Sequence, residues 1–201
     1  MIKAVISDLG RVLIDFDNSI FFSKMSRHSP FSEEEIKEMM FENESLISAF
    51  DLGELTPEEF HAQAMYILKS SLSFGTFFSI YNDVFSLNSR NVRILKKLKR
   101  NYRLVMLSNT DVMRFGFIKR KFPQVMFFDE YVLSFEVGCM KPSASIYRIA
   151  LEKALSEPKE CVFLDDREEN VEAAMNLGIR GIHIAPGIDL EKELKKEGLK
   201  L

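Results

Sequence analysis

The stretch Ala4-Val5-Ile6-Ser7-Asp8-Leu9-Gly10-Arg11-Val12-Leu13 decides how the rest of the chain is interpreted. Its apolar start, residues 4–6, predicts a short buried strand, and Gly10 predicts a turn directly after that strand. Asp8 therefore stands at the exit of a buried strand, where an unpaired charge is costly. This placement indicates a functional site at the strand end, although a turn aspartate or a helix N-cap would have the same local sequence.

Further short apolar runs continue this pattern along the chain. The expected strands cover residues 104–107, 161–164 and 181–184, with a weaker one at 131–135. The expected helices include residues 92–98, 146–151 and 171–175, where apolar residues recur at helical spacing. Alternation of strands and helices predicts an α/β fold, a doubly wound parallel sheet with helices on both faces. Ligands of such sheets bind beyond the carboxyl ends of the strands.

Residues 15–88 interrupt this alternation and have the features of helices. Ser32 and Glu35 form a capping-box pattern. The segment Thr56-Pro57-Glu58-Glu59 combines an N-cap, a proline at the first helical position and acidic residues in the first turn. A third, aromatic helix is expected from about Gly75 to Phe85.

These features predict a two-part organisation. We expect a core domain formed by residues 1–14 and 89–201, and a helical cap domain, residues 15–88, inserted over the end of the sheet. Eleven of the eighteen phenylalanines lie in residues 16–85. They either fill the core of the cap or line an apolar substrate pocket.

Two adjacent carboxylates, Asp165 and Asp166, follow the expected strand at residues 161–164. Such a pair repels itself unless a cation lies beside it. Mg²⁺ is commonly held by one or two carboxylates together with a substrate phosphate. The sequence therefore predicts a Mg²⁺ site, without deciding which of the two carboxylates touches the metal. Asp166 can alternatively cap the helix that follows.

Two further polar groups are candidates for binding phosphate. Lys141 precedes Pro142, which fixes the backbone before a helix with Ser143 near its N-cap. A lysine held there would neutralise phosphate as a point charge. Ser108 ends the expected strand at residues 104–107, and its hydroxyl and the main-chain N–H groups of Asn109 and Thr110 would hold phosphoryl oxygens.

In chain order, Asp8, Ser108, Lys141 and the Asp165-Asp166 pair resemble the four motifs of the haloacid dehalogenase-like (HAD) hydrolases, and the resemblance covers nearly the whole chain. It implies that Asp8 attacks phosphorus and forms an aspartyl-phosphate, with Lys141 as the second catalytic residue. Ser108, Asn109, Thr110 and Lys141 would bind the substrate. Asp8, the Gly10 carbonyl oxygen, Asp165 and Asp166 would hold Mg²⁺.

Gly10 departs from the usual pattern of phosphatases in this superfamily. They carry a second aspartate two residues after the nucleophile, which protonates the leaving alkoxide and then activates water. Glycine cannot do this work, which is worth ~10²–10⁴-fold in rate. The Asp-Leu-Gly sequence is similar to a small-cap subgroup that includes sugar-phosphate phosphatases of the α-D-glucose-1-phosphate type. Asp15 and Asp17, at the entrance to the cap, are either substitute acids or polar hinge residues.

The resemblance leaves three hypotheses about function. The first is a Mg²⁺-dependent phosphomonoester hydrolase that acts on a small phosphorylated metabolite, with a sugar phosphate as the first expectation. The second is a metal-independent 2-haloacid dehalogenase, since these enzymes also lack the second aspartate. The third is a non-catalytic binding protein on the same fold. The paired Asp165-Asp166 favours phosphate and metal, because the fourth motif of the dehalogenases is not a paired aspartate.

Composition restricts the classes of partner and the cellular compartment that we expect for the protein. The 201-residue chain is 46% hydrophobic and 28% charged, and its net charge of −3 predicts neither nucleic-acid nor membrane binding. Its two cysteines do not form a disulfide framework, and the N-terminus is charged too soon for a signal peptide. We therefore expect a cytoplasmic protein.

Overall fold

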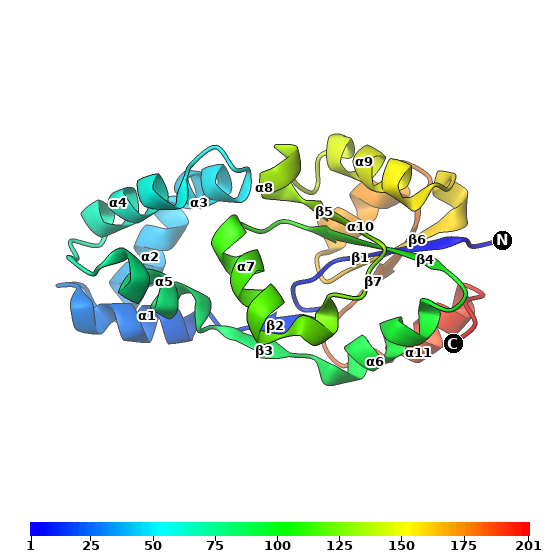
Figure 1. The fold of residues 1–201 in the computed structure, drawn as a ribbon, viewed down its shortest axis with the longest axis horizontal. Coiled ribbons are helices and arrows are strands. Elements are labelled where there is room, and N and C mark those ends of the chain that lie inside the picture. Colours follow the sequence, from blue (N-terminus) through cyan, green and yellow to red (C-terminus); the bar gives the residue numbers. More distant parts are fainter.

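The computed structural model describes residues 1–201 and is built around one parallel sheet (Figure 1). Its strands lie in the order β5-β4-β1-β6-β7, and every neighbouring pair is parallel. The five strands are β1 (Ala4–Ser7), β4 (Arg103–Ser108), β5 (Glu130–Leu133), β6 (Cys161–Asp165) and β7 (Arg180–His183). From the central β1, the chain extends the sheet on one side and then on the other. The predicted doubly wound sheet is therefore confirmed, with its switch point beside β1.

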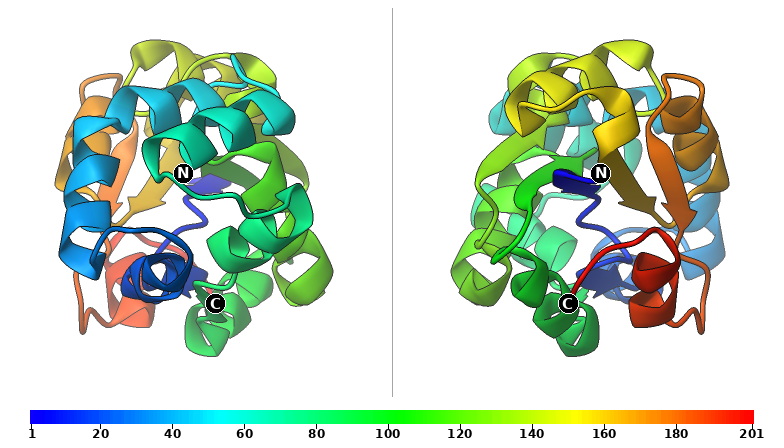
Figure 2. Two further views of the ribbon diagram at one scale, coloured as in Figure 1. Left: turned by 90° about the vertical axis from the view of Figure 1, so that its left-hand side faces the viewer. Right: turned by 90° about the vertical axis from the view of Figure 1, so that its right-hand side faces the viewer.

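Helices cover both faces of this sheet because alternate residues of each strand are buried on opposite sides. Val5, Met106 and Leu164 belong to the hydrophobic cluster on one face, which the helices α6 (Ser89–Leu98), α7 (Val112–Lys121) and α11 (Leu190–Lys196) complete. Ile6 and Leu107 belong to the cluster on the other face, against α9 (Ala144–Ala154) and α10 (Glu168–Met175). The two helical layers appear on either side of the sheet in Figure 2. Short 3₁₀ turns lie at Pro123–Val125 and Pro158–Glu160.

Two of the strands end earlier than expected. The strand expected at residues 131–135 ends at Leu133, and a short helix, α8 (Ser134–Val137), follows directly. Gly138, with φ of 64°, closes this helix in the left-handed conformation that glycine tolerates. The strand expected at residues 181–184 begins one residue earlier and ends one residue earlier.

A layer of helices stands at one end of the sheet and forms the inserted cap (Figures 1 and 2). These helices are α1 (Ser19–Met25), α2 (Glu33–Glu42), α3 (Glu44–Asp51), α4 (Pro57–Ile67) and α5 (Phe74–Asn82), with a 3₁₀ turn at Ser26–His28. The predicted capping box of Ser32 and Glu35 is confirmed at the start of α2. The predicted N-cap Thr56 opens α4, where Glu59 completes a second capping box.

A small antiparallel pair of strands joins the cap to the core. Strand β2 (Ile14–Phe16) leaves the core and β3 (Phe85–Leu87) returns to it, and the sequence did not predict this pair. The aromatic helix expected to reach Phe85 ends at Asn82 instead, because Phe85 belongs to β3. The pair lies beside the domain boundaries predicted at residues 14–15 and 88–89, which stay a prediction.

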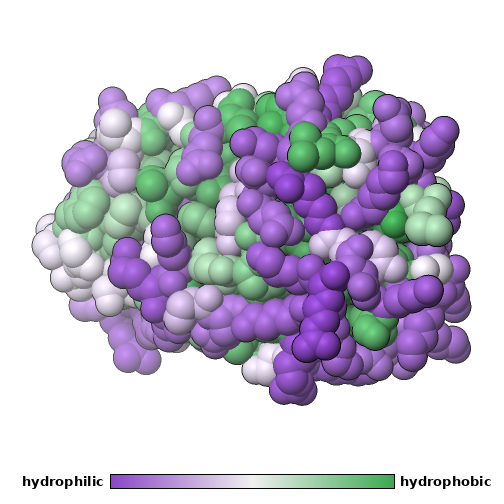
Figure 3. Space-filling view, turned by 45° about the vertical axis from the view of Figure 1, so that its right-hand side comes forward, coloured by the Kyte–Doolittle hydropathy of each residue, from purple (hydrophilic) through white to green (hydrophobic).

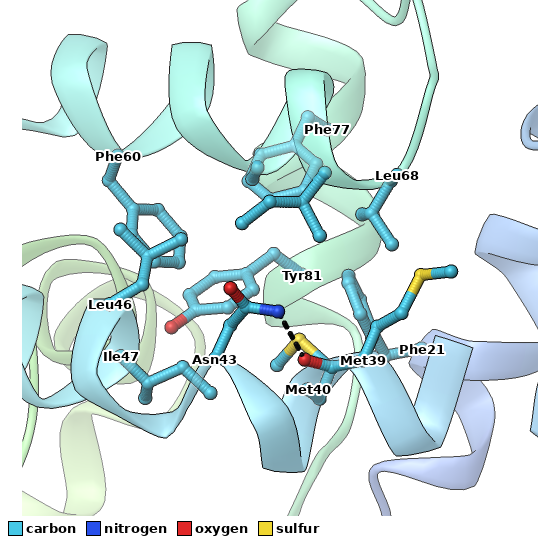
Figure 4. A pocket seen from close by; sticks show the side chains of 12 residues that line it. Phe21, Met39, Met40, Asn43, Leu46, Ile47, Phe60, Leu68, Phe77 and Tyr81 are labelled. Carbon is cyan, nitrogen blue, oxygen red and sulfur yellow. Dashed lines mark hydrogen bonds between the residues drawn. The ribbon is translucent and has the colours of Figure 1, made fainter. Parts of the chain in front are cut away.

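The phenylalanines of the cap form a core of their own. Phe50 stacks on Phe60 with ring centroids 4.2 Å apart, and Phe77 stacks on Tyr81 at 5.7 Å. The apolar hollow lined by Phe60, Phe77 and Tyr81 is about 20 Å³, close to the space of one water molecule (Figure 4). The buried phenylalanines therefore fill the core of the cap, and this hollow is too small for a substrate.

The surface is mainly polar. Hydrophobic residues on the face in Figure 3 appear in groups interrupted by hydrophilic ones. Apart from the terminal Met1, the most exposed large hydrophobic side chains are Phe41 in α2, Tyr66 in α4 and Leu155 directly after α9. No helix combines the length and the apolar character needed to cross a membrane.

Candidate active site

The carboxyl ends of three neighbouring strands bring the predicted residues together. Asp8 follows β1, Ser108 ends β4 and Asp165 ends β6, and β1 lies between the other two strands. Asp8, Ser108, Lys141 and Asp166 line one cavity of about 280 Å³ between this edge of the sheet and the cap. Parallel pairing therefore gathers groups that are as many as 158 positions apart in the chain, Asp8 and Asp166.

Lys141 is buried between two carboxylates. Its Nζ atom lies 2.8 Å from Oδ1 of Asp8 and 2.7 Å from Oδ2 of Asp165. The side chain of Asn109 fixes the backbone of Lys141 from both sides: its Oδ1 accepts a hydrogen bond from the Lys141 N–H, and its Nδ2 donates to the Lys141 carbonyl oxygen. Asn109 therefore positions the lysine, a role that the sequence did not predict for its side chain.

Asp165 is occupied by protein donors on both oxygen atoms. Its Oδ1 accepts hydrogen bonds from the Arg167 N–H and from Nδ2 of Asn170, while its Oδ2 receives Lys141. Asn170 thus orients Asp165. The alternative that Asp166 caps the following helix is wrong, since the N-cap of α10 is Arg167 and has no side-chain capping bond.

Asp166 and Asp8 retain more freedom to bind a cation. The nearest cationic partner of Asp166 is Nε of Arg11, 3.9 Å away. Both hydrogen bonds to the side chain of Asp8, from Leu9 and Lys141, go to Oδ1. Carboxylate oxygens of Asp8, Asp165 and Asp166 all lie within 4.8 Å of one another. Three carboxylates around one ammonium group leave a negative excess, and the donor set is the hard oxygen type that Mg²⁺ prefers.

The electrostatics of the cluster reflect this excess. Burial raises the pKa of Asp8 to about 6, against the opposing effect of Lys141. Burial and the neighbouring Asp165 also raise the pKa of Asp166. Burial alone would lower the pKa of Lys141, but Asp8 and Asp165 outweigh it and hold the pKa above its ordinary value. The lysine is therefore charged, and the carboxylates lack a further positive charge.

Only part of the predicted phosphate-binding turn, Ser108 to Thr110, is free to bind a ligand. Ser108 is buried and lines the cavity, as does Asn109. The N–H of Thr110, however, donates a hydrogen bond to Oγ of Ser134 at 2.9 Å, and Oγ of Ser134 donates back to the Thr110 carbonyl oxygen. The expectation that this N–H holds a phosphoryl oxygen is corrected, because the group is already used inside the core.

The turn after Asp8 leaves room at Gly10. The left-handed backbone of this turn belongs to Arg11, with φ of 50°, and not to Gly10. A Cβ atom on Gly10 would lie 3.5 Å from the ring of Phe16, an ordinary contact, and 3.9 Å from Oδ2 of Asp8. Glycine is therefore not required here by backbone conformation. The Gly10 carbonyl oxygen accepts a hydrogen bond from the Val12 N–H at 2.6 Å.

Neither candidate for a substitute acid lines the cavity that contains Asp8. Asp17 is exposed and accepts hydrogen bonds from the N–H and hydroxyl of Ser19, which hold its pKa below the usual range. Asp15 lines a different hollow, together with Arg11. Their environments fit the hinge interpretation.

Helix α3 of the cap supplies residues that the sequence did not single out. Glu44, Ser48 and Asp51 line the cavity, together with Arg114 from α7 of the core. Oδ1 of Asp51 and Nε of Arg114 are buried without a hydrogen-bond partner. No motif or spacing marks these residues, because only the packing of the cap against the core brings them to the site.

Comparison with known proteins agrees with this geometry. Residues 2–178 match the haloacid dehalogenase-like hydrolase family. The chain is 22% identical to D-ribitol-5-phosphate phosphatase of Bacteroides thetaiotaomicron, over 96% of this chain and 97% of that protein. It is 24% identical to a sesquiterpene phosphatase of Aspergillus oryzae, over 96% and 95%. It is 25% identical to drimenol cyclase of Aspergillus calidoustus over 96% of its own length, but spans only 36% of that protein.

A solved structure with the same architecture contains the ligands expected for such a site. A HAD family enzyme of Bacteroides thetaiotaomicron, in complex with magnesium and inorganic phosphate, superposes with a TM-score of 0.87 at 26% identity, covering 96% of this chain and 99% of that one. The family match extends over most of the chain and includes all the strands that carry the site. The chain therefore belongs to the haloacid dehalogenase-like hydrolase family.

Proposed function

We propose that this protein is a Mg²⁺-dependent phosphomonoester hydrolase that acts through an aspartyl-phosphate on Asp8. The observation that carries the proposal is the cluster of Asp8, Asp165 and Asp166 within 4.8 Å, held by Lys141. The related enzyme with bound magnesium and phosphate supports it.

The proposed roles follow from the contacts of each residue. Asp8 and Asp166 have carboxylate oxygens left for Mg²⁺. The Gly10 carbonyl oxygen would be a third ligand of the metal. Asp165 holds Lys141 in place. When bound, Mg²⁺ would neutralise charge on the phosphate and position it. Lys141 stabilises the transferred phosphoryl group from the other side, and Ser108 and Asn109 line the space that its oxygens would occupy.

In the first half-reaction, a carboxylate oxygen of Asp8 attacks phosphorus in line with the leaving oxygen. In the second, water attacks the aspartyl-phosphate and regenerates Asp8. The cap closes over the cavity and limits access of bulk water to the intermediate.

A small hydroxylated metabolite, such as a polyol or sugar phosphate, fits the cavity best. Only seven of its twenty lining residues are hydrophobic, and α3 contributes Glu44, Ser48 and Asp51. The relative that acts on ribitol 5-phosphate supports this class. A terpenyl phosphate, as named for another relative, would bury its hydrocarbon chain against these polar groups.

A steady-state assay tests the proposal. Ribitol 5-phosphate, glucose 1-phosphate and an aryl phosphate are offered with Mg²⁺, and we expect phosphate release that chelator abolishes. Full activity in EDTA would refute the metal-dependent mechanism and would favour the dehalogenase alternative, which halide release from 2-haloacids measures directly. Stable folding with no turnover on any ester would favour a binding protein.

A further inference from the structure

The proposed reaction needs a proton donor for the leaving oxygen, which Gly10 cannot supply. Four acidic residues line the cavity. Two of them, Asp8 and Asp166, are assigned to the nucleophile and the metal. The other two, Glu44 and Asp51, come from opposite ends of α3.

Asp51 and Glu44 differ in their surroundings. Glu44 is exposed in the first turn of α3. Asp51, the last residue of α3, is half-buried, and its Oδ1 is buried without any hydrogen-bond partner. Buried polar atoms in folded proteins nearly always have a partner, and an unpartnered one in a residue that lines a cavity points to a catalytic role or to a bound water or ion. Asp51 is therefore the stronger candidate.

A close backbone contact fixes the position of Asp51. Gly53, two residues later, has φ of +73°, and a Cβ atom there would lie 2.3 Å from the carbonyl oxygen of Phe135 in α8. Only glycine permits both the conformation and the approach. The end of α3 thus lies directly against the core, and Asp51 lines the cavity from this packed junction.

The groups around Asp51 leave it able to hold a proton. Burial raises its pKa from the ordinary value of 3.8 to about 7; Arg114 opposes this shift and Asp111 adds to it. Asp111 itself is occupied, because its carboxylate accepts hydrogen bonds from Tyr81 Oη and from the N–H groups of Met113 and Arg114. An acid that titrates near neutral pH is suited both to donate a proton and to take one back.

We propose that Asp51 protonates the leaving oxygen of the substrate, in place of an acid at position 10; this inference rests on the proposed phosphatase function. As Asp8 forms its bond to phosphorus, the bond to the leaving oxygen breaks, its electron pair stays on that oxygen, and the proton of Asp51 is transferred to it. In the second half-reaction, the Asp51 carboxylate takes a proton from the attacking water, and the bond between Asp8 and phosphorus breaks. Asp51 is then protonated again and the cycle closes.

A pair of esters of similar size isolates the proton transfer. Ethyl phosphate releases a weakly acidic alcohol, whereas trifluoroethyl phosphate releases a more acidic one that departs with less help. An aryl phosphate serves as a third substrate that leaves without protonation. The variant is Asp51→Asn, which keeps the size and hydrogen bonding of the side chain but has no proton to transfer. Glu54→Gln, an exposed change three residues along the chain, is the matched control.

We expect Asp51→Asn to lower kcat on ethyl phosphate by ~10²–10³-fold, within the range of a single acid–base group, and on the aryl phosphate by less than about threefold. The loss of kcat on trifluoroethyl phosphate should lie between these two values. The kcat of Glu54→Gln should equal that of the unmodified protein on all three esters. An equal loss on every ester, or no loss on ethyl phosphate, would overturn the role of Asp51. If the unmodified protein hydrolyses none of the esters with Mg²⁺, it is the proposed function that fails. Thermal unfolding of both variants excludes loss of the fold as a cause.

Discussion

The Nζ atom of Lys141 lies 2.8 Å from Oδ1 of Asp8, and this ion pair orients the proposed nucleophile before any ligand arrives. Because Lys141 and Leu9 both donate to Oδ1, Oδ2 is the oxygen of Asp8 that remains free of protein donors. The lysine is itself held by Asn109 and Asp165, so the geometry of Asp8 depends on three strands at once. The following predictions use this dependence.

Replacing Asp8 by asparagine should abolish turnover, because an amide is not a competent nucleophile. The side chain contributes little apolar packing, so the fold should persist. We expect less than about a hundredth of the original activity, at least the loss typical of a single catalytic group. Steady-state kinetics and thermal unfolding check both parts, and a more active variant would rule out the covalent mechanism.

Replacing Lys141 by methionine should destabilise the protein and slow the reaction. Its buried ammonium group separates Asp8 from Asp165, and its removal leaves the two facing carboxylates without the cation that they share. Breaking a buried ion pair from one side typically costs ~3–5 kcal/mol. Urea unfolding in EDTA measures the loss, with Lys37→Met, an exposed site, as the control. Equal stability of the two variants would contradict the assigned role.

The metal site should depend more on Asp166 than on Asp165. Both oxygens of Asp165 already accept hydrogen bonds, whereas Asp166 has only a distant contact with Arg11. Asp166→Asn should therefore raise the Mg²⁺ concentration needed for thermal stabilisation about tenfold or more, and Asp165→Asn should raise it less. The double change should reproduce the effect of chelator on activity. A larger effect of Asp165→Asn than of Asp166→Asn would mean that Asp165 binds the metal and Asp166 does not.

Much of the fold could be predicted because apolar runs and capping residues act locally. The capping boxes at Ser32 and Thr56 are formed by residues within one turn, and the structure contains both. The end of β5 could not be predicted, since Ser134 leaves the strand to exchange hydrogen bonds with Thr110 of a neighbouring loop. The pairing of β2 with β3 likewise joins segments separated by the whole cap.

The residues of the candidate site likewise include some that the sequence predicts and some that it does not. Asp8 and Asp165 could be predicted, because each directly follows or ends a strand whose apolar run is visible in the sequence. Asp51 and Arg114 could not, because they come together only in the folded protein, where α3 of the cap packs against α8 and lines the same cavity as Arg114 of α7.

Introducing an acid at Gly10 should restore what Asp51→Asn removes. The position has room for a Cβ atom, 3.5 Å from Phe16, and does not need the left-handed conformation. In the Asp51→Asn background, Gly10→Asp should raise kcat on ethyl phosphate by about tenfold or more and flatten the dependence of log kcat on the pKa of the leaving group. In the unmodified protein the same change should add little. A tenfold gain there instead would mean that no acid is present in the native site.

The free energy of unfolding should depend on pH in a way that reveals the raised pKa of Asp51. Its pKa is raised from 3.8 to about 7 by burial, so between these values the folded state retains a proton that the unfolded state has released. The free energy of unfolding therefore falls as pH rises through this window. Asparagine cannot ionise, so Asp51→Asn should gain stability relative to the unmodified protein, from nothing near pH 4 to ~1–4 kcal/mol at pH 8, since each pKa unit corresponds to ~1.4 kcal/mol. Subtracting urea-unfolding free energies at each pH cancels the titration of the other groups. A difference that does not change with pH would mean that the Asp51 carboxyl ionises with its ordinary pKa, and it would then hold no proton to donate at neutral pH.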